Sequence, residues 1–256
     1  MQTKILCISI LVIVLIFSNI QASELQIVSD PYPPLGYVNN DGEIVGITVE
    51  IIRALLKESG FNGKFRMLPW ARAYVLAQTE KNILIYTLVK NDERERLFKL
   101  IGPVIQSKYY LYKLKKRNDI QLSSLNDAKK YLIGVVDSYY SHKYLMSQGF
   151  QEGENLDKVR SSELNLQKFI AQRFDLIICP EFDFNYQAKK LGYDVNNFEK
   201  AYFVTSVDAY IGFSRKTDDE IVKRFGQALK SIRKDKTYDK ILNKYRTKTK
   251  MRHQGR

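Results

Sequence analysis

Few side chains in this sequence could carry out catalysis or bind a metal. Of 256 residues, two are histidine, His142 and His253, and two are cysteine, Cys7 and Cys179. Two cysteines are too few for a Cys-based zinc site or a disulfide scaffold. No Gly-x-Ser-x-Gly, HExxH, phosphate-loop or paired-cysteine motif occurs. Cys179 ends the apolar run 174–179, which favours a buried small hydrophobe over a nucleophile. We therefore predict a protein that is not an enzyme, with no cofactor and no metal.

Side chains suited to binding are more numerous. Arg94 stands in a charged run at residues 93–96, and a guanidinium group can hold a carboxylate through two parallel hydrogen bonds. Trp70, the single tryptophan, follows Pro69 where a helix would begin, and aromatic faces offer contact area and attract cations. Each has a plainer alternative. Arg94 is then an exposed charge, with Arg96 the residue in register, and Trp70 is part of the core.

The elements that must position these residues alternate between strands and helices. Continuous apolar runs at 83–89, 133–136 and 174–179 predict strands buried on both faces. Helical spacing predicts helices at 49–59, 69–78, 141–146, 163–172 and 182–191, and one C-terminal helix from Asp219 that includes Tyr245. The turn at 39–42 predicts a hairpin. This alternation indicates α/β architecture, and its restart near 109–113 with a return at 202–213 predicts two lobes.

The first 22 residues have the pattern of an export signal. Lys4 supplies the positive start, and an uncharged apolar core of 13 residues spans 5–17. A membrane span needs about 20 apolar residues, so an uncleaved anchor is the weaker alternative. Cleavage after Ala22 would leave a soluble chain outside the cytoplasm that folds without an internal disulfide.

The net charge of +13 is concentrated near the C-terminus. Residues 206–256 carry 15 basic and six acidic side chains. Such a tail is usually a solvated face, and attraction to anionic lipid is the alternative. No zinc-finger spacing, RNA-binding aromatic motif or basic zipper accompanies the charge, so we expect no nucleic-acid partner.

Several short segments are not specific alone, but their order and spacing along the chain are informative. They are residues 32–37 with Asp41-Gly42, then 45–50, 91–94, 101–103, 133–135 and 236–245. Together they resemble the extracytoplasmic solute-binding proteins of amino-acid transport type, family 3, over nearly all of the mature chain. The run Pro69-Trp70-Ala71-Arg72-Ala73 further resembles a stand-alone proteobacterial subgroup of that family.

The resemblance implies an α/β fold of the periplasmic-binding-protein type II, with two α/β lobes joined by a two-strand hinge. The signal peptide would span 1–22, lobe 1 would begin at 23–110, lobe 2 would span 111–205, and 206–256 would return to lobe 1 with the C-terminal helix and basic tail. The implied function is capture of a small polar solute, an amino acid or related compound, in the periplasm for ABC transport or sensing. The expected partners are the ligand and a membrane permease or sensor, and we expect a monomer.

The resemblance also implies which side chains bind the ligand. Arg94 aligns with the arginine that clamps a ligand carboxylate, and Tyr32 and Trp70 align with the aromatic pair around the ligand side chain. Arg72 either points into the same cleft or covers the helix surface. The expected ligand-binding set is Tyr32, Trp70, Arg72, Thr87, Arg94, Ser138, Tyr139 and Glu181.

The second lobe departs from the family pattern. Tyr139 and Tyr140 stand where small residues cradle the ligand, and Pro180-Glu181 replaces an aspartate that binds the ligand amine. Glu181 would serve if the loop shifts by one residue. Two alternatives follow: a dehydratase-like enzyme of the same fold with Glu181 as general acid, or an envelope interaction protein without a ligand that uses its basic C-terminus.

Overall fold

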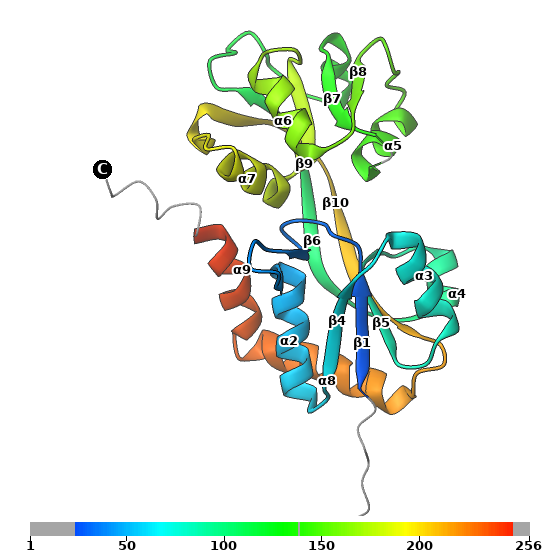
Figure 1. Ribbon diagram of the computed structural model, residues 1–256. Helices are drawn as coiled ribbons and strands as arrows, with labels where there is room; N and C mark the ends of the chain where they lie inside the picture. Colours follow the sequence, from blue (N-terminus) through cyan, green and yellow to red (C-terminus); the bar gives the residue numbers. More distant parts are fainter. Residues whose placement is uncertain (1–23, 138, 248–256) are drawn as a thin grey trace, which may run out of the picture.

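The computed structural model describes residues 24–137 and 139–247, which form two lobes connected by two long strands (Figure 1). The predicted signal peptide, Ser138 and the end of the basic tail lie outside the described residues. Within the described part of the chain, no helix is long and apolar enough to cross a membrane.

One mixed sheet runs through both lobes. Among the described residues its strand order is β4-β1-β5-β10-β6-β9-β7-β8. In lobe 1, β1 (Leu25–Ser29) pairs in parallel with β4 (Gly63–Met67) and β5 (Ile83–Val89). In lobe 2, β7 (Ile133–Val136) pairs in parallel with β8 (Leu156–Val159) and β9 (Leu176–Pro180). The predicted α/β architecture with largely parallel sheets is confirmed.

The lobes are joined by two antiparallel strands of 17 residues each, β6 (Phe98–Leu114) and β10 (Phe198–Ser214). β10 pairs with β5 of lobe 1 from residue 209 onward, and β6 pairs with β9 of lobe 2 from residue 109 onward. Between these contacts, residues 106–108 of β6 face residues 206–208 of β10, and no other described strand pairs with them. This two-stranded stretch is the hinge, and the predicted lobe boundaries at 110 and 205 fall within the same two strands.

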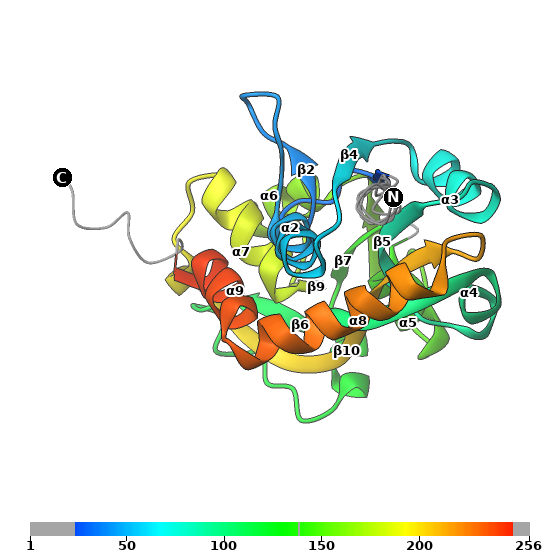
Figure 2. The same cartoon turned by 90° about the horizontal axis from the view of Figure 1, so that it is seen from below.

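Helices cover both faces of the sheet in each lobe. Lobe 1 carries α2 (Ile47–Ser59), α3 (Trp70–Thr79), α4 (Asp92–Leu97), α8 (Asp219–Lys234) and α9 (Thr237–Thr247). Lobe 2 carries α5 (Tyr140–Ser147), α6 (Ser162–Ile170) and α7 (Glu181–Lys190), with 3-10 turns at Leu125–Lys130 and Val195–Asn197. The predicted hairpin is present as β2 (Tyr37–Val38) and β3 (Ile44–Val45). Figure 2 shows α8 and α9 together on the outer side of lobe 1.

Each lobe buries an apolar cluster on each side of its part of the sheet. In lobe 1, the cluster containing Phe213 and Phe225 lies under α2 and α8, and a second cluster containing Ala73 and Ala77 lies under α3. In lobe 2, the cluster around Phe169 lies on the α6 and α7 side. Because both faces are covered, the strands read as continuous apolar runs, as the sequence predicts.

The prediction of a single C-terminal helix is wrong, because the structure has two helices in its place, α8 and α9. Lys236 has a left-handed φ of 68°, which ends α8, and the Asp235 carboxylate accepts a hydrogen bond from the backbone N–H of Thr237 at 2.8 Å, which begins α9. The break turns α9 back onto lobe 1, where the hydroxyl of Tyr245 donates to Glu50 at 2.6 Å.

Candidate functional site

An arginine-aromatic cluster lies where α3 and α4 meet the end of β5. The guanidinium carbon of Arg94 lies 5.9 Å from the ring centroids of both Trp70 and Tyr74. Its Nη1 donates to the carbonyl oxygen of Val89 at 2.6 Å, and its backbone N–H donates to the capping side chain of Asn91 at 2.8 Å. The structure thus brings together two of the predicted site residues, Trp70 and Arg94, and fixes the orientation of the guanidinium group.

The two other arginines considered for ligand binding lie differently. Arg72 is exposed on α3, and Arg96 is exposed on α4. Arg94, by contrast, is half-buried, so of the two arginines in the run 93–96 it is the one turned toward the protein. Arg72 makes no hydrogen bond or ion pair to another side chain of the described residues, which fits the surface interpretation of its role.

Thr87, another predicted site residue, holds a strained backbone conformation at the end of β5. Its φ is 67°, in the left-handed region that β-branched residues rarely adopt. Its hydroxyl oxygen is buried and has no hydrogen-bond partner among the described residues. Strain of this kind costs about 1–3 kcal/mol and is concentrated at ligand sites. The strand end beside Arg94 therefore has the features of a binding edge.

Tyr32 joins the two lobes. Its ring makes edge-to-face contacts with Tyr139 at 6.1 Å and with Phe182 at 6.4 Å, both from lobe 2. Burial raises the pKa of the Tyr32 hydroxyl, and the nearby Tyr109 and Asp183 raise it further. Tyr32 and Tyr139, predicted from opposite halves of the chain, are thus brought together at the contact between lobes.

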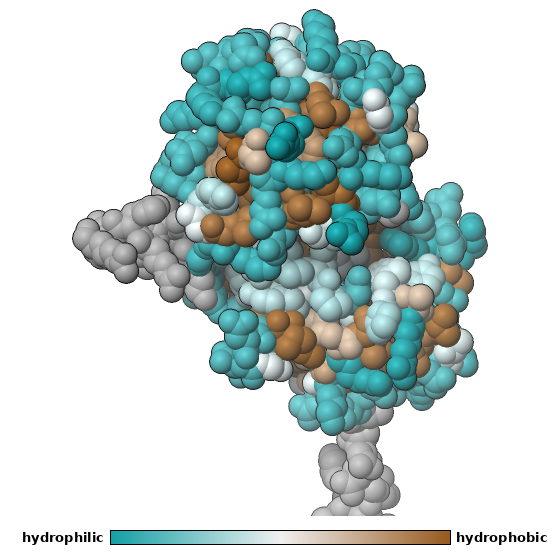
Figure 3. All heavy atoms as spheres, turned by 45° about the horizontal axis from the view of Figure 1, so that its top comes forward, coloured by the Kyte–Doolittle hydropathy of each residue, from teal (hydrophilic) through white to brown (hydrophobic). Residues whose placement is uncertain are grey.

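Other side chains also meet across this boundary. Tyr37 of lobe 1 contacts Tyr186 of lobe 2 with ring centroids 5.6 Å apart. A surface pocket beside the hinge is lined by Val89 and Asn91 of lobe 1 and Tyr140 of lobe 2. Figure 3 shows hydrophobic side chains on both sides of the line where the lobes meet, among hydrophilic ones.

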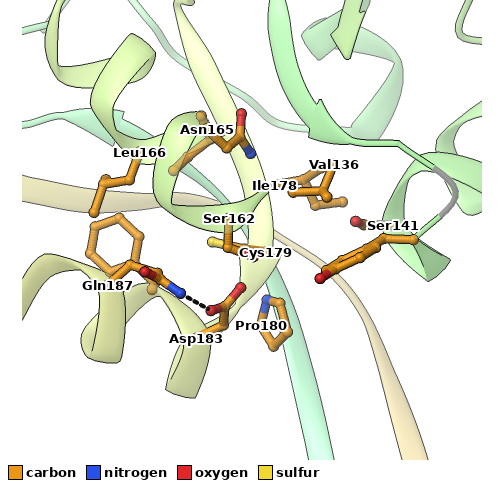
Figure 4. A pocket seen from close by; sticks show the side chains of 13 residues that line it. Val136, Ser141, Ser162, Asn165, Leu166, Ile178, Cys179, Pro180, Asp183 and Gln187 are labelled. Atoms are coloured by element: carbon orange, nitrogen blue, oxygen red, sulfur yellow. Dashed lines mark hydrogen bonds between the residues drawn. The ribbon is translucent and has the colours of Figure 1, made fainter. Parts of the chain in front are cut away.

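A pocket inside lobe 2 holds a buried carboxyl group (Figure 4). Asp183 on α7 is only 2% exposed, and its carboxylate accepts a hydrogen bond from Gln187 at 3.2 Å and one from the Ser162 side chain. Burial raises the pKa of Asp183 to about 6. In the described part of the chain no Lys or Arg forms an ion pair with it. Tyr139 and Pro180 also line this pocket, so it extends to the contact between the lobes.

Glu181, the carboxylate predicted from sequence, lies outside this pocket. It forms an ion pair with Lys200 of β10 at 2.5 Å, and its side chain is 43% exposed. α7 begins at Glu181, and two residues turn a helix by about 200°, so Asp183 faces the opposite side and enters the core. Sequence reasoning missed Asp183, although it falls in a stripe with Phe184 and Gln187 that a helical projection would have marked as buried.

A second carboxyl group that sequence reasoning missed is Asp30, directly after β1. Asp30 is half-buried, and burial raises its pKa. Burial also raises the pKa of Tyr139, and Asp183 and then Asp30 add to this effect. The Tyr139 hydroxyl is therefore near two carboxyl groups, one from each lobe.

The described residues offer no group of three or more His, Cys, Asp or Glu side chains that could hold a metal ion. Cys179 is buried and free, as predicted, and burial raises the pKa of its thiol, which suppresses the reactive thiolate. The chemistry of this region is therefore that of aromatic faces, one guanidinium group and two desolvated carboxyl groups.

Comparison with known proteins identifies the family. Residues 25–248 match the bacterial extracellular solute-binding proteins, family 3. The chain belongs to this family. A probable histidine-binding protein of Neisseria gonorrhoeae is 23% identical over 221 residues, which cover 84% of this chain and 79% of that protein.

Solved structures of this fold include binding proteins and a sensor. An ancestral cationic amino acid solute-binding protein superposes with a TM-score of 0.74 at 19% identity, covering 88% of this chain and 96% of the other. A histidine kinase sensor domain similar to periplasmic binding proteins gives 0.71 at 17% identity, covering 89% and 97%. These similarities show the type II periplasmic-binding-protein fold for this family 3 protein, and the predicted family and fold are confirmed.

Proposed function

We propose that this family 3 protein captures an amino acid or a related small polar compound between its lobes, and passes it to a membrane permease or a sensor. The observation that carries the proposal is the position of Arg94, oriented by Val89 and two aromatic rings at the strained end of β5. A guanidinium group held in this way is prepared to bind a ligand carboxylate. The names of its relatives, which include histidine-binding and cationic amino acid binding proteins, support the same class of solute.

The hinge supplies the motion that this function needs. Residues 106–108 and 206–208 are a two-stranded connection, whereas both lobes have multi-stranded cores. Bending is therefore easiest there, and the contacts of Tyr32 with Tyr139 and Phe182 lie where the lobes meet. Exclusion of water on closure strengthens each polar contact to the ligand.

A thermal-shift screen of the mature chain against amino acids, amines, organic acids and small sugars tests this proposal. A ligand at 100 times its dissociation constant stabilises a protein by about 2.7 kcal/mol, which shifts the melting temperature by a few degrees at this size. We expect a stabilising carboxylate-containing solute whose affinity falls at least about thirtyfold in Arg94→Ala, since a charge-assisted pair contributes about 2–5 kcal/mol.

The matched control is Arg96→Ala, which removes the same charge from an exposed position on the same helix. Its affinity should stay within about twofold of the wild type, because exposed charges contribute little. Equal losses in both variants would indicate a general electrostatic effect, and binding unaffected by either would remove Arg94 from the site.

We further propose that residues 1–22 direct the chain to the periplasm and are cleaved there. The proposal rests on the uncharged apolar core at 5–17 and on membership of an extracellular family. Mass spectrometry of the exported protein should find Ser23 as the first residue. Retention of the intact N-terminus in a membrane fraction would indicate an anchor instead.

A further inference from the structure

The second half of α8 and the beginning of α9 carry a strongly basic surface that the proposed function does not use. Residues 221–247 hold nine basic and two acidic side chains, which gives this segment a net charge of +7. The sequence continues with four more basic residues and no acidic one at 248–256. Figure 1 shows α8 at the end of lobe 1 that is remote from lobe 2, so the surface on α8 lies away from the contact between the lobes.

The lysines of this surface point outward, because the apolar residues of both helices take the inner face. Lys230 and Lys234 are exposed and four residues apart, about one helical turn, so they lie one above the other. The buried residues of α8 lie on the opposite side of the helix: Ile221, Phe225, Ala228, Leu229 and Ile232. On α9, Lys240 is exposed, whereas Ile241 and Leu242 pack against the core of lobe 1.

The acidic residues of the same segment leave most of this charge uncompensated. Asp239 pairs with Lys236 at 3.5 Å. Asp235 accepts a hydrogen bond from the backbone N–H of Thr237 at 2.8 Å, which lowers the pKa of its carboxyl group, and the charge of Lys240 contributes least to this lowering. Three exposed lysines form no ion pair with any described residue: Lys230, Lys234 and Lys240.

The composition of this surface indicates the kind of partner that it fits. None of the exposed large hydrophobic residues of the described chain lies on α8 or α9. Protein interfaces usually have aromatic or apolar anchors at their centre, and this surface lacks them. Lysine acts as a point charge on a flexible stem, whereas arginine recognises single planar groups. A layer of lipid phosphates presents diffuse negative charge, which attracts each nearby lysine.

We propose that the basic surface formed by Lys230, Lys234 and Lys240 docks on an anionic phospholipid bilayer. Lobe 1 then rests on the lipid through α8, and the contact between the lobes stays clear of the membrane. The inference goes beyond the proposed function, because docking needs no solute. It would keep the protein beside a membrane-bound permease or sensor.

Cosedimentation of the mature chain with lipid vesicles tests this inference. We expect binding to vesicles of phosphatidylglycerol and phosphatidylethanolamine, and none to vesicles of phosphatidylcholine alone. Salt at about 1 M should release the chain, because the Debye length falls to about 3 Å. The combined variant Lys230→Glu, Lys234→Glu and Lys240→Glu should bind at least about a hundredfold more weakly, since each lysine near an anionic surface contributes roughly a fivefold factor.

The matched control reverses three exposed lysines of lobe 2, and so changes the net charge by the same amount: Lys115→Glu, Lys116→Glu and Lys143→Glu. Its vesicle binding should stay within about threefold of the wild type, because these positions lie outside the docking surface. Equal losses in the two combined variants would indicate a general charge effect and overturn the inference. Equal binding of the wild type to both kinds of vesicle, or tighter binding to DNA than to the anionic vesicles, would also overturn it.

Two further variants keep the test decisive. If the charge-reversed chain does not fold, Lys230→Gln, Lys234→Gln and Lys240→Gln remove the same charges and should weaken binding at least about tenfold. A chain that ends at Thr247 should still bind the anionic vesicles, and its failure to bind would assign the attraction to residues 248–256 instead. Arg94→Ala should bind vesicles like the wild type, so failure of solute capture and failure of membrane docking are distinguishable.

Discussion

The two lobes present different chemistry to the boundary between them. Lobe 1 offers an arginine that is already oriented, between Trp70 and Tyr74 and bonded to Val89, at a strand end strained at Thr87. Lobe 2 offers a carboxyl group, Asp183, buried without a described cationic partner. In lobe 1 a backbone carbonyl and two aromatic rings orient the charged side chain, whereas in lobe 2 the buried carboxyl group receives two side-chain hydrogen bonds and no counter-charge from the described residues.

The same difference between the lobes is seen at the positions that the family resemblance indicated as ligand-binding. In lobe 1 the resemblance named Arg94 and Trp70, and the structure brings them together. In lobe 2 it pointed to the position of Glu181, which pairs with Lys200 at the surface.

The largest expected effect on stability comes from Asp183→Asn without ligand. A carboxyl group whose pKa is raised from 3.8 to about 6 in the folded state stabilises the fold below about pH 4, and that contribution is lost as pH rises to about 6. Above pH 6 the folded wild type carries an uncompensated charge. Asp183→Asn should therefore be about as stable as the wild type at pH 4 and about 1–3 kcal/mol more stable at pH 8.

Chemical denaturation at both pH values measures this difference. Asp30→Asn is the matched comparison from lobe 1, because burial raises the pKa of Asp30 too, in a half-buried position where water weakens the effect. The gain in the free energy of unfolding at pH 8 should be smaller for Asp30→Asn than for Asp183→Asn. If Asp183→Asn were instead less stable than the wild type at pH 8, Asp183 would be a structural hydrogen-bonding group, and the contrast between the lobes would break down.

A smaller effect is expected from Thr87→Gly in lobe 1. Glycine adopts the φ of 67° without strain, and this gain outweighs its greater entropy loss on folding, so the variant should be about 0.5–1 kcal/mol more stable. Thr205→Gly in β10, where the backbone φ is not in the left-handed region, should lose about 1 kcal/mol. Denaturant midpoints of the two variants decide the sign. If both variants are less stable than the wild type, the packing of the Thr87 side chain contributes more to stability than its backbone strain costs.

Sequence patterns predicted the elements that depend on local spacing. The apolar runs at 83–89 and 133–136 are buried strands, and the turn at 39–42 forms its hairpin. They were predictable because burial on both faces demands an uninterrupted apolar run. The break at Lys236 was not, because apolar positions continue in helical register into α9 while the turn is fixed by Asp235 and by docking onto Glu50.

The candidate site shows the same division. Cys179 was predictable as a buried residue because its strand is apolar throughout. Asp183 was missed because a charged residue is normally expected outside, although its place on α7 in a stripe with Phe184 and Gln187 indicates that it turns inward. Asp30, which precedes a proline-rich loop, could not be predicted as a site residue. What marks it is its effect on the pKa of Tyr139, which belongs to the other lobe.

The smallest expected effect on stability comes from the Glu181–Lys200 pair. It tests the contrast between this exposed carboxylate and the buried Asp183. Both side chains are more than 40% exposed, and exposed ion pairs contribute about 0–1 kcal/mol. Glu181→Gln should therefore change the free energy of unfolding by about 0.5 kcal/mol or less. Lys200→Met should show the same small loss. High salt should abolish even this difference, because exposed charges are screened. A loss above about 2 kcal/mol would mean that the Glu181–Lys200 pair stabilises the fold as a buried ion pair does, and the contrast between an exposed Glu181 and a buried Asp183 would not hold.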